Sequence, residues 1–202
     1  MNVFYLHPEP VTCAQMQCNA HVSKMCIEYA QMMSTAHRVL DGELWYGRTT
    51  HGRRIARYFH PDPDMQHTLY KAVHINHPST QWVRANVETY QWMYDMWTAT
   101  CLEFKYRYGK HHESFTKLEY ALLYPPKEIV NRKFFEPPPA MKQRPECIVE
   151  GDAVQSYRNF YWADKREFAK WTKREPPQWW RKFEDENDGG QGRQATADEG
   201  KS

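Results

Sequence analysis

The sequence has no long apolar run, and its five cysteines show no paired spacing. The first absence excludes a transmembrane helix, which needs about 20 apolar residues, and the start of the chain has neither the basic nor the apolar segment of a signal peptide. The odd cysteine number argues against a disulfide framework and for a reducing compartment. The motifs GxxxxGK[ST], GxGxxG, HExxH, GxSxG and CxxC are also missing, which disfavours nucleotide hydrolases and hydride-transfer enzymes.

Metal ligands are not evident either, although the chain has ten histidines. Cys18 and His21 are three residues apart, with Cys13 and Cys26 nearby, but structural zinc sites usually show tighter ligand pairs. The cysteines are better explained as small core residues. We therefore expect neither a metal nor another cofactor.

The net charge of +2 conceals an asymmetry. Residues 184–202 contain six acidic and two basic residues, a net of −4, so the rest of the chain carries +6. Within that body, residues 155–183 have eight basic and three acidic side chains interleaved with aromatic residues. Such alternation suits a polyanion with stackable bases, although an amphipathic helix with a solvated charged face would give the same pattern.

The spacing of apolar residues predicts three long helices and one shorter helix. Apolar side chains recur every three or four residues along each span, and Gly or Pro follows at most of the expected ends. The expected spans are Val11–Leu40, Ser79–Tyr108, Glu113–Tyr124 and Asp152 to about Trp171.

The segments between these helices carry different signals. Residues 41–78 form a loop-rich excursion with several arginines and histidines, and a small hairpin is expected near residues 43–58. Residues 125–150 are proline-rich and indicate an ordered wrap or linker, whereas residues 184–202 indicate a disordered acidic tail. We therefore predict an all-α fold with one compact domain over residues 1–183.

A polar stripe accompanies the apolar face of the first long helix. A glutamate with basic residues one and two turns before it could act as a general acid–base beside an anion site. The same Lys24 and Glu28 could instead form an exposed i,i+4 pair on a solvated face. The stripe consists of His21, Lys24, Glu28, Gln31, Thr35 and Arg38.

The start of the second long helix also allows two interpretations. His77 and Pro78 precede Ser79, and free N–H groups at a helix start can hold a phosphate, with Arg84 as an additional donor. A capped helix with Trp82 in the core explains the same residues without any ligand.

Several of these segments occur in an order that resembles a known family. His21 and Glu28 are seven residues apart with the basic Lys24 between them. Further along come His77-Pro78 with Trp82, then Glu103 with Arg107-Tyr108-Gly109, and then the aromatic and basic run Lys170–Arg174. Together they resemble the pyrimidine-dimer DNA glycosylase family, the phage endonuclease V type and its bacterial relatives. The resemblance lies mostly in residues 1–40 and 74–110.

This resemblance implies an endonuclease V-like fold and a DNA glycosylase with AP-lyase activity on damaged or modified pyrimidines. The N-terminal amine would attack the sugar C1′ and displace the base, since α-amines have pKa values near 8 and are partly neutral. Asn2 is too large for ready removal of Met1, so Met1 would present this amine. Glu28 would shuttle the C2′ proton of the imine, while His21 and Lys24 would orient the site and bind phosphate.

Double-stranded DNA is the implied partner, and we expect a monomer with no membrane association in the cytoplasm of a bacterial host cell, if the chain is phage-encoded. Trp171, Trp179 or Trp180 would wedge into the base stack. The expected phosphate contacts are Arg38, Arg48, Arg53, Arg54, Arg57, His77, Arg84, Lys173 and Arg174.

Two other classes stay open. One is a non-catalytic DNA-binding, host-takeover protein that keeps the fold. The other is a DNA- or nucleotide-modifying enzyme that reuses the face around Glu28. A covalent adduct with an abasic-site duplex, trapped by borohydride, would separate a lyase from a mere binder because only an imine can be reduced to such an adduct.

Overall fold

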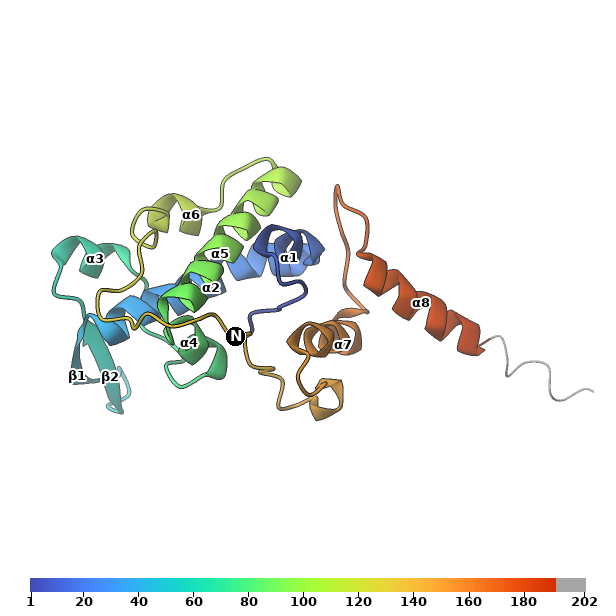
Figure 1. The fold of residues 1–202 in the computed structure, drawn as a ribbon. Coiled ribbons are helices and arrows are strands. Elements are labelled where there is room, and N and C mark those ends of the chain that lie inside the picture. Colours follow the sequence, from blue (N-terminus) through green and yellow to red (C-terminus); the bar gives the residue numbers. More distant parts are fainter. Residues whose placement is uncertain (192–202) are drawn as a thin grey trace, which may run out of the picture.

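The structure is a computed structural model that describes residues 1–191 (Figure 1). The expected acidic tail begins inside the last helix, and residues 192–202 lie outside the described chain. Within residues 1–191, no helix combines the length and apolar character needed to cross a bilayer. The elements are α1 (Pro10–Met16), α2 (Asn19–Leu40), β1 (Glu43–Arg48), β2 (Arg54–Phe59), α3 (Pro63–Thr68), α4 (Pro78–Val83), α5 (Val87–Tyr108), α6 (Glu113–Leu118), a 3-10 turn (Pro145–Cys147), α7 (Ala153–Lys165) and α8 (Gln178–Gln191).

The predicted all-α class is wrong. The protein is mostly helical, but β1 and β2 form a two-stranded antiparallel sheet with Glu43 opposite Phe59. The turn between the strands passes through Gly52 at φ +76°, a left-handed conformation that glycine adopts without strain. Because β1 is exposed along almost its whole length, it has no alternation of apolar and polar residues that would mark a half-buried strand. The hairpin therefore had to be inferred from its turn residues alone.

The first predicted helix is two helices, α1 and α2. The chain is extended at Gln17 and Cys18, where the side chain of Arg107 fills the gap. Its guanidinium donates to the carbonyl oxygens of Gln15 at 3.0 Å and Gln17 at 2.9 Å, which satisfies carbonyls that a continuing helix would have bonded. Both helices pack on α5, so the apolar spacing continues across the break.

The second predicted helix also divides, into α4 and α5. Asn86 is extended and begins α5 with a capping box, in which its side chain accepts from the Thr89 N–H at 3.0 Å. Gly109, at φ +74°, ends α5. The other two helices stop before their expected ends, α6 at Leu118 and α7 at Lys165. Local capping thus decided boundaries that periodicity could not locate.

The N-terminal segment is anchored in the core. Residues 3–6 are buried between helices, where Tyr29 on α2 donates to the Val3 carbonyl and Arg158 on α7 donates to the Leu6 carbonyl at 3.0 Å. Met1 lies beside α4, with its sulfur 3.9 Å from the Thr80 hydroxyl. The start of the chain therefore has a fixed place next to α2 and α4 (Figure 1).

The proline-rich segment runs in extended conformation over α4 and the start of α5. The Val130 carbonyl accepts from the Val87 N–H at 3.0 Å, and the Phe135 carbonyl accepts from the Trp82 indole at 2.8 Å. Further on, Tyr157 of α7 donates to the Pro138 carbonyl at 2.9 Å. The segment thus connects the first half of the molecule to α7. Figure 1 shows the hairpin and α8 at opposite ends.

Candidate functional site

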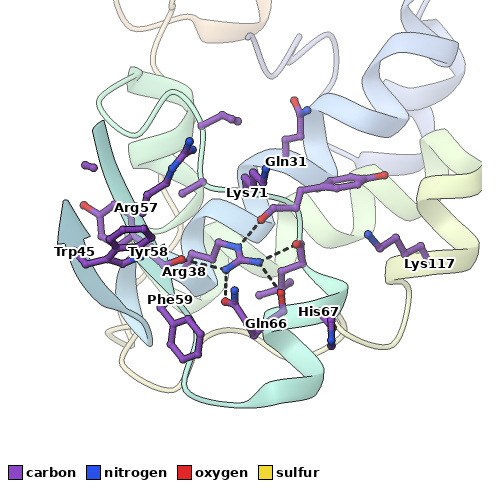
Figure 2. Close-up of a pocket in the computed structure, with 15 residues that line it drawn as sticks. Gln31, Arg38, Trp45, Arg57, Tyr58, Phe59, Gln66, His67, Lys71 and Lys117 are labelled. Atoms are coloured by element: carbon purple, nitrogen blue, oxygen red, sulfur yellow. Dashed lines mark hydrogen bonds between the residues drawn. The ribbon is translucent and has the colours of Figure 1, made fainter. Parts of the chain in front are cut away.

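A cleft of about 660 Å³ lies between α2, the hairpin and the segment that follows α3 (Figure 2). Arg57 from β2, Lys71 from the segment after α3 and Lys117 from α6 bring their positive charges to it. Trp45 and Tyr70 add aromatic surface. Among the described residues that line the cleft there is no Asp or Glu. The cleft is therefore suited to an anion, and its aromatic walls suit a base or another flat group.

Arg38 forms the buried side of this cleft. All five N–H donors of its guanidinium are bonded to oxygens within the protein. It therefore has no donor left for a phosphate, and the predicted direct DNA contact by Arg38 is wrong. Its charge still adds a positive field, since burial lowers the pKa but an arginine stays charged in proteins. The acceptors are the Tyr58, Gln66, Leu69 and Tyr70 carbonyls and the Gln66 side chain, at 2.6–3.1 Å.

The hairpin presents unpaired positive charge. Arg48 lies directly opposite Arg54, and like charges in such a cross-strand position are destabilising unless an anion intervenes. Arg54 also stacks on Tyr46, with its guanidinium carbon 3.7 Å from the ring centroid. Within the described chain, Arg48, Arg53, Arg54 and Arg57 form no ion pair within 4.0 Å. The four arginines predicted to contact DNA thus remain available to it.

Glu28 lies on α2 before the part of this helix that the segment after α3 covers. Thr35, two turns further along, accepts from the Val73 N–H at 3.1 Å, so the segment after α3 covers that part of the polar stripe. Glu28 is 17% exposed, and its Oε1 is 3.0 Å from the Lys24 ammonium. Its Oε2 is buried without a hydrogen-bond partner among residues 1–191. A buried carboxylate oxygen that lacks a partner is costly, and such groups occur where a ligand or a proton is handled.

His77 lies within electrostatic range of both Glu28 and the Met1 amine. Its Nδ1 accepts from the Ser79 N–H at 3.2 Å, so α4 is a capped helix and its start is not free for a phosphate. Burial lowers the pKa of His77, the Met1 amine lowers it further, and Glu28 opposes them. The amine and the carboxylate thus both act on this ring, although no ion pair within 4.0 Å joins them in the described chain.

Arg84 and Trp82 complete the start of the second helical segment. Arg84 donates to the Thr80 carbonyl at 3.2 Å, within its own helix, and Trp82 is buried. Of the two interpretations of this segment, the geometry therefore supports the capped helix with Trp82 in the core. Arg84 retains further N–H groups, but α4 itself offers no anion site.

His21 is a core residue. It is buried, its Nδ1 lies 2.7 Å from the Tyr161 hydroxyl, and its ring stacks on Phe4 at a centroid distance of 4.2 Å. Burial lowers the pKa of His21 to about 3, and the Lys165 and Lys24 charges act in the same direction. This position does not support the predicted catalytic role of His21, because the ring is buried among aromatic side chains two helical turns before Glu28.

Of the three tryptophans expected to wedge into DNA, Trp179 and Trp180 belong to the core, and the half-buried Trp171 packs against it. Trp179 and Trp180 are buried, and the Trp171 indole donates to the Met16 carbonyl at 3.0 Å. Trp180 lies 5.0 Å from Trp171 between ring centroids. Inserting any of them into a base stack would open this cluster, so the wedge prediction is wrong for the described conformation.

Lys173 and Arg174 are held by other parts of the protein. Arg174 donates to both oxygens of Glu103, at 3.0 and 2.9 Å, and Arg107 donates to the same carboxylate at 2.7 Å. Lys173 donates to the Tyr106 carbonyl at 2.9 Å. These contacts join the segment between α7 and α8 to the last turns of α5, whereas the basic cleft lies beside the hairpin. The structure thus does not bring the two predicted DNA-binding groups together.

One group in the described chain brings three metal-ligating side chains together. His37, Asp41 and His60 each offer a ligand atom, and these atoms lie within 4.8 Å of one another. A search for tight sequence pairs missed it because the hairpin separates His60 from the other two. The available signal was the i,i+4 spacing of His37 and Asp41 together with a hairpin that returns the chain to the same point.

Comparisons with protein-family models, with curated proteins and with solved structures found no match for this chain. The class that its own geometry defines is a mostly helical protein with a basic cleft and, three residues before Gln31 of the cleft lining on α2, a partly buried glutamate.

Proposed function

We propose that the protein binds double-stranded DNA through the hairpin and the basic cleft, and that it acts there as a glycosylase with AP-lyase activity on damaged or modified pyrimidines. The observation that carries this proposal is the buried, unpartnered Oε2 of Glu28, together with the electrostatic effect of both Glu28 and the Met1 amine on His77. The protein would act as a monomer in the cytoplasm of a bacterial host cell, if it is phage-encoded.

The chemistry assigns separate tasks to the amine and the carboxylate. The neutral Met1 amine attacks C1′ of the target nucleotide, the glycosidic bond breaks, and the base leaves with a proton. The ring-opened sugar is then joined to the protein as an imine, which acidifies the C2′ proton. Glu28 accepts this proton, and the 3′ phosphate leaves by β-elimination. Lys24, with its ammonium 3.0 Å from Glu28 Oε1, holds the carboxylate in place for this step.

The DNA contacts in this proposal differ from those first expected. Arg57, Lys71 and Lys117 take the phosphates next to the site, and the hairpin arginines extend the contact along the duplex. Trp45, 52% exposed at the cleft, replaces the buried tryptophans as the side chain that can stack on an unpaired base. Extruding a damaged base costs less than extruding an intact one, which favours lesions as substrates.

The test is borohydride trapping on a duplex with one abasic site. Wild-type protein should form a covalent adduct and nick the strand, and Glu28→Gln should lower nicking by about 10²-fold or more while DNA affinity holds. Glu113→Gln, at an exposed glutamate of α6, is the matched control and should behave as wild type. Protein with an added N-terminal extension should lose both activities because its amine is displaced. Wild-type protein that forms no adduct would refute the lyase.

A second candidate is a DNA-binding protein without catalysis. It is favoured by the opposed Arg48 and Arg54 and by the cleft without carboxylates, since both features require only an anionic partner. In that case binding should fall steeply with salt, the adduct should be missing, and Glu28→Gln should leave every measured property within error.

A further inference from the structure

The last turn of α2 and the residue that follows β2 bring two histidines and an aspartate together. His37 and Asp41 are one helical turn apart, with His37 Nδ1 3.9 Å from Asp41 Oδ2. The hairpin returns the chain so that His60 joins them, and the three ligand atoms lie within 4.8 Å of one another. Metal bonds of about 2.0–2.2 Å place neighbouring ligand atoms roughly 3.3 Å apart. A contraction of the cluster would therefore be enough to surround an ion.

His37 presents a lone pair to this point. Tyr90 donates its only hydroxyl proton to the Leu122 carbonyl at 2.9 Å. The 2.9 Å contact between the same hydroxyl and His37 Nε2 therefore requires the proton on Nε2. Nδ1 is then unprotonated, and it is buried without a partner in the described chain. A ligand histidine whose other nitrogen donates to a fixed acceptor is the usual arrangement in metal sites.

Asp41 is fixed in orientation. Its Oδ2 accepts from the Lys127 N–H at 3.0 Å and its Oδ1 from the Glu128 N–H at 3.1 Å. Each carboxylate oxygen has a further lone pair, so these bonds orient the group without consuming its capacity as a ligand.

His60 supplies the third atom. Its ring is buried, and Nε2 has no partner among residues 1–191. Nδ1 now accepts from the Asp62 N–H at 3.2 Å, which leaves the proton of the neutral ring on Nε2. Binding of an ion would move that proton to Nδ1 and release the Asp62 N–H. The His60 Nδ1–H must then turn away from the Asp62 N–H, so one long hydrogen bond is lost, while His37 Nδ1 and His60 Nε2 each gain the ion as a partner.

We propose that His37, Asp41 and His60 bind one divalent first-row transition-metal ion of the Zn²⁺ class. Two imidazoles and one carboxylate suit such an ion better than Mg²⁺ or Ca²⁺, which prefer oxygen ligands alone. A second cleft of about 370 Å³ adjoins the site and is lined by Asp41 and His60 themselves. Asp62, Glu128 and Lys127 also line it, so three carboxylates oppose one ammonium and the net charge of the lining favours a cation. The remaining coordination position faces this cleft and takes water or a ligand oxygen.

The site is separate from the proposed lyase. His37 is nine residues beyond Glu28 on α2, which corresponds to about 13.5 Å along the helix axis. It is, however, connected to the basic cleft, because Gln66 Oε1 accepts both from the His60 N–H at 2.8 Å and from Arg38 at 2.6 Å. An ion here would fix the base of the hairpin that presents the arginines.

The proposal is tested on the full chain after treatment with a chelator. Calorimetric titration with Zn²⁺ should show one equivalent bound, and Co²⁺ should give the visible bands of nitrogen and oxygen ligation. His60→Gln and Asp41→Asn should each lower the affinity at least about 100-fold. His67→Gln, at an exposed histidine of α3, is the control and should leave affinity unchanged. Tyr90→Phe, which removes the acceptor of the His37 N–H, should lower affinity by 10- to 100-fold.

Melting curves keep the result interpretable if a variant folds poorly. Zn²⁺ should raise the melting temperature of wild type and of His67→Gln but not of His60→Gln. If a variant is unfolded, the wild-type Co²⁺ spectrum decides. Wild-type protein that binds no stoichiometric Zn²⁺, equal affinity in His60→Gln and Asp41→Asn, or a thiolate-to-cobalt charge-transfer band would each overturn the proposal.

Discussion

Basic residues cluster at both ends of the molecule, but in the described chain they bond to acidic partners at only one end. At the α7–α8 end, Arg174 bonds to Glu103, Arg144 bonds to Asp164 at 2.7 Å, and Arg181 bonds to Glu175 at 2.6 Å. At the hairpin end, the described arginines have no such acidic partner and the cleft contains no carboxylate. Basic residues therefore stabilise the fold at the α7–α8 end, whereas at the hairpin end they leave a positive surface that an anion can bind.

The aromatic residues follow the same division. At the α7–α8 end Trp179 and Trp180 pack against Tyr161, whereas at the hairpin end Trp45 and Tyr46 are exposed. A run of basic and aromatic residues in sequence thus does not distinguish an interface from a core. The distinction lies in whether acids and apolar surfaces elsewhere in the chain fold onto that run.

The largest expected effect is at Glu103. Glu103→Gln removes the charge that holds Arg107 and Arg174, and breaking a buried ion pair in this way costs about 3–5 kcal/mol. Burial raises the pKa of Glu103, but the hydrogen bonds from the two arginines outweigh it and lower the pKa. Chemical denaturation would measure the loss. An unfolding free energy within about 1 kcal/mol of wild type would show that this end is not built on the ion cluster.

Next come two tryptophans, one from each end. Trp180→Ala should destabilise the fold by about 3–5 kcal/mol because the side chain is buried. Trp45→Ala should leave stability nearly unchanged but weaken binding to distorted DNA by about 1–3 kcal/mol. Melting curves and binding titrations on both variants provide the measurement. The reverse pattern would place the DNA surface at the α7–α8 end.

Acid should weaken the α7–α8 end through His21. Burial holds the pKa of His21 at about 3 in the folded protein, below its ordinary value of 6.5. Between these values the unfolded chain binds a proton that the folded chain does not, so stability is lost as pH falls, by up to roughly 1.4 kcal/mol per pH unit. His21→Gln, which does not titrate, should show a shallower fall of unfolding free energy between pH 6.5 and 4. Parallel curves for the two proteins would contradict this.

The smallest effects are expected at single lysines of the cleft. Lys71→Ala or Lys117→Ala should weaken DNA binding a few-fold and reduce the salt slope by about 1, as expected for one phosphate contact. Lys105→Ala, at an exposed position on α5, is the matched control and should leave the slope unchanged. A larger loss at Lys105 than at the cleft lysines would move the interface away from the cleft.

The sequence predicted the long helical faces of α2 and α5, but not the breaks beside them, the helices α3 and α8, or the fold class. Apolar spacing correctly marked the faces of α2 and α5, because burial on one side imposes that spacing. It could not reveal the break at Gln17, which depends on Arg107 from ninety residues further along. For the same reason the sequence could not distinguish the members of the polar stripe. His21 is in the core, every N–H donor of the Arg38 guanidinium is bonded, and Glu28 is only partly buried. Long-range partners, absent from any local pattern, decide these differences.

The five oxygens around Arg38 have a consequence for motion. They come from β2, from α3 and from the segment that follows it, so the guanidinium joins three pieces of chain that are otherwise short and separate. None of the three can detach alone without leaving a buried charge short of acceptors. We therefore expect the amides of residues 58–70 to exchange with solvent hydrogen as one cooperative unit, with a shared opening free energy. A region rich in loops by its sequence would then behave, on the timescale of exchange, as a single rigid element.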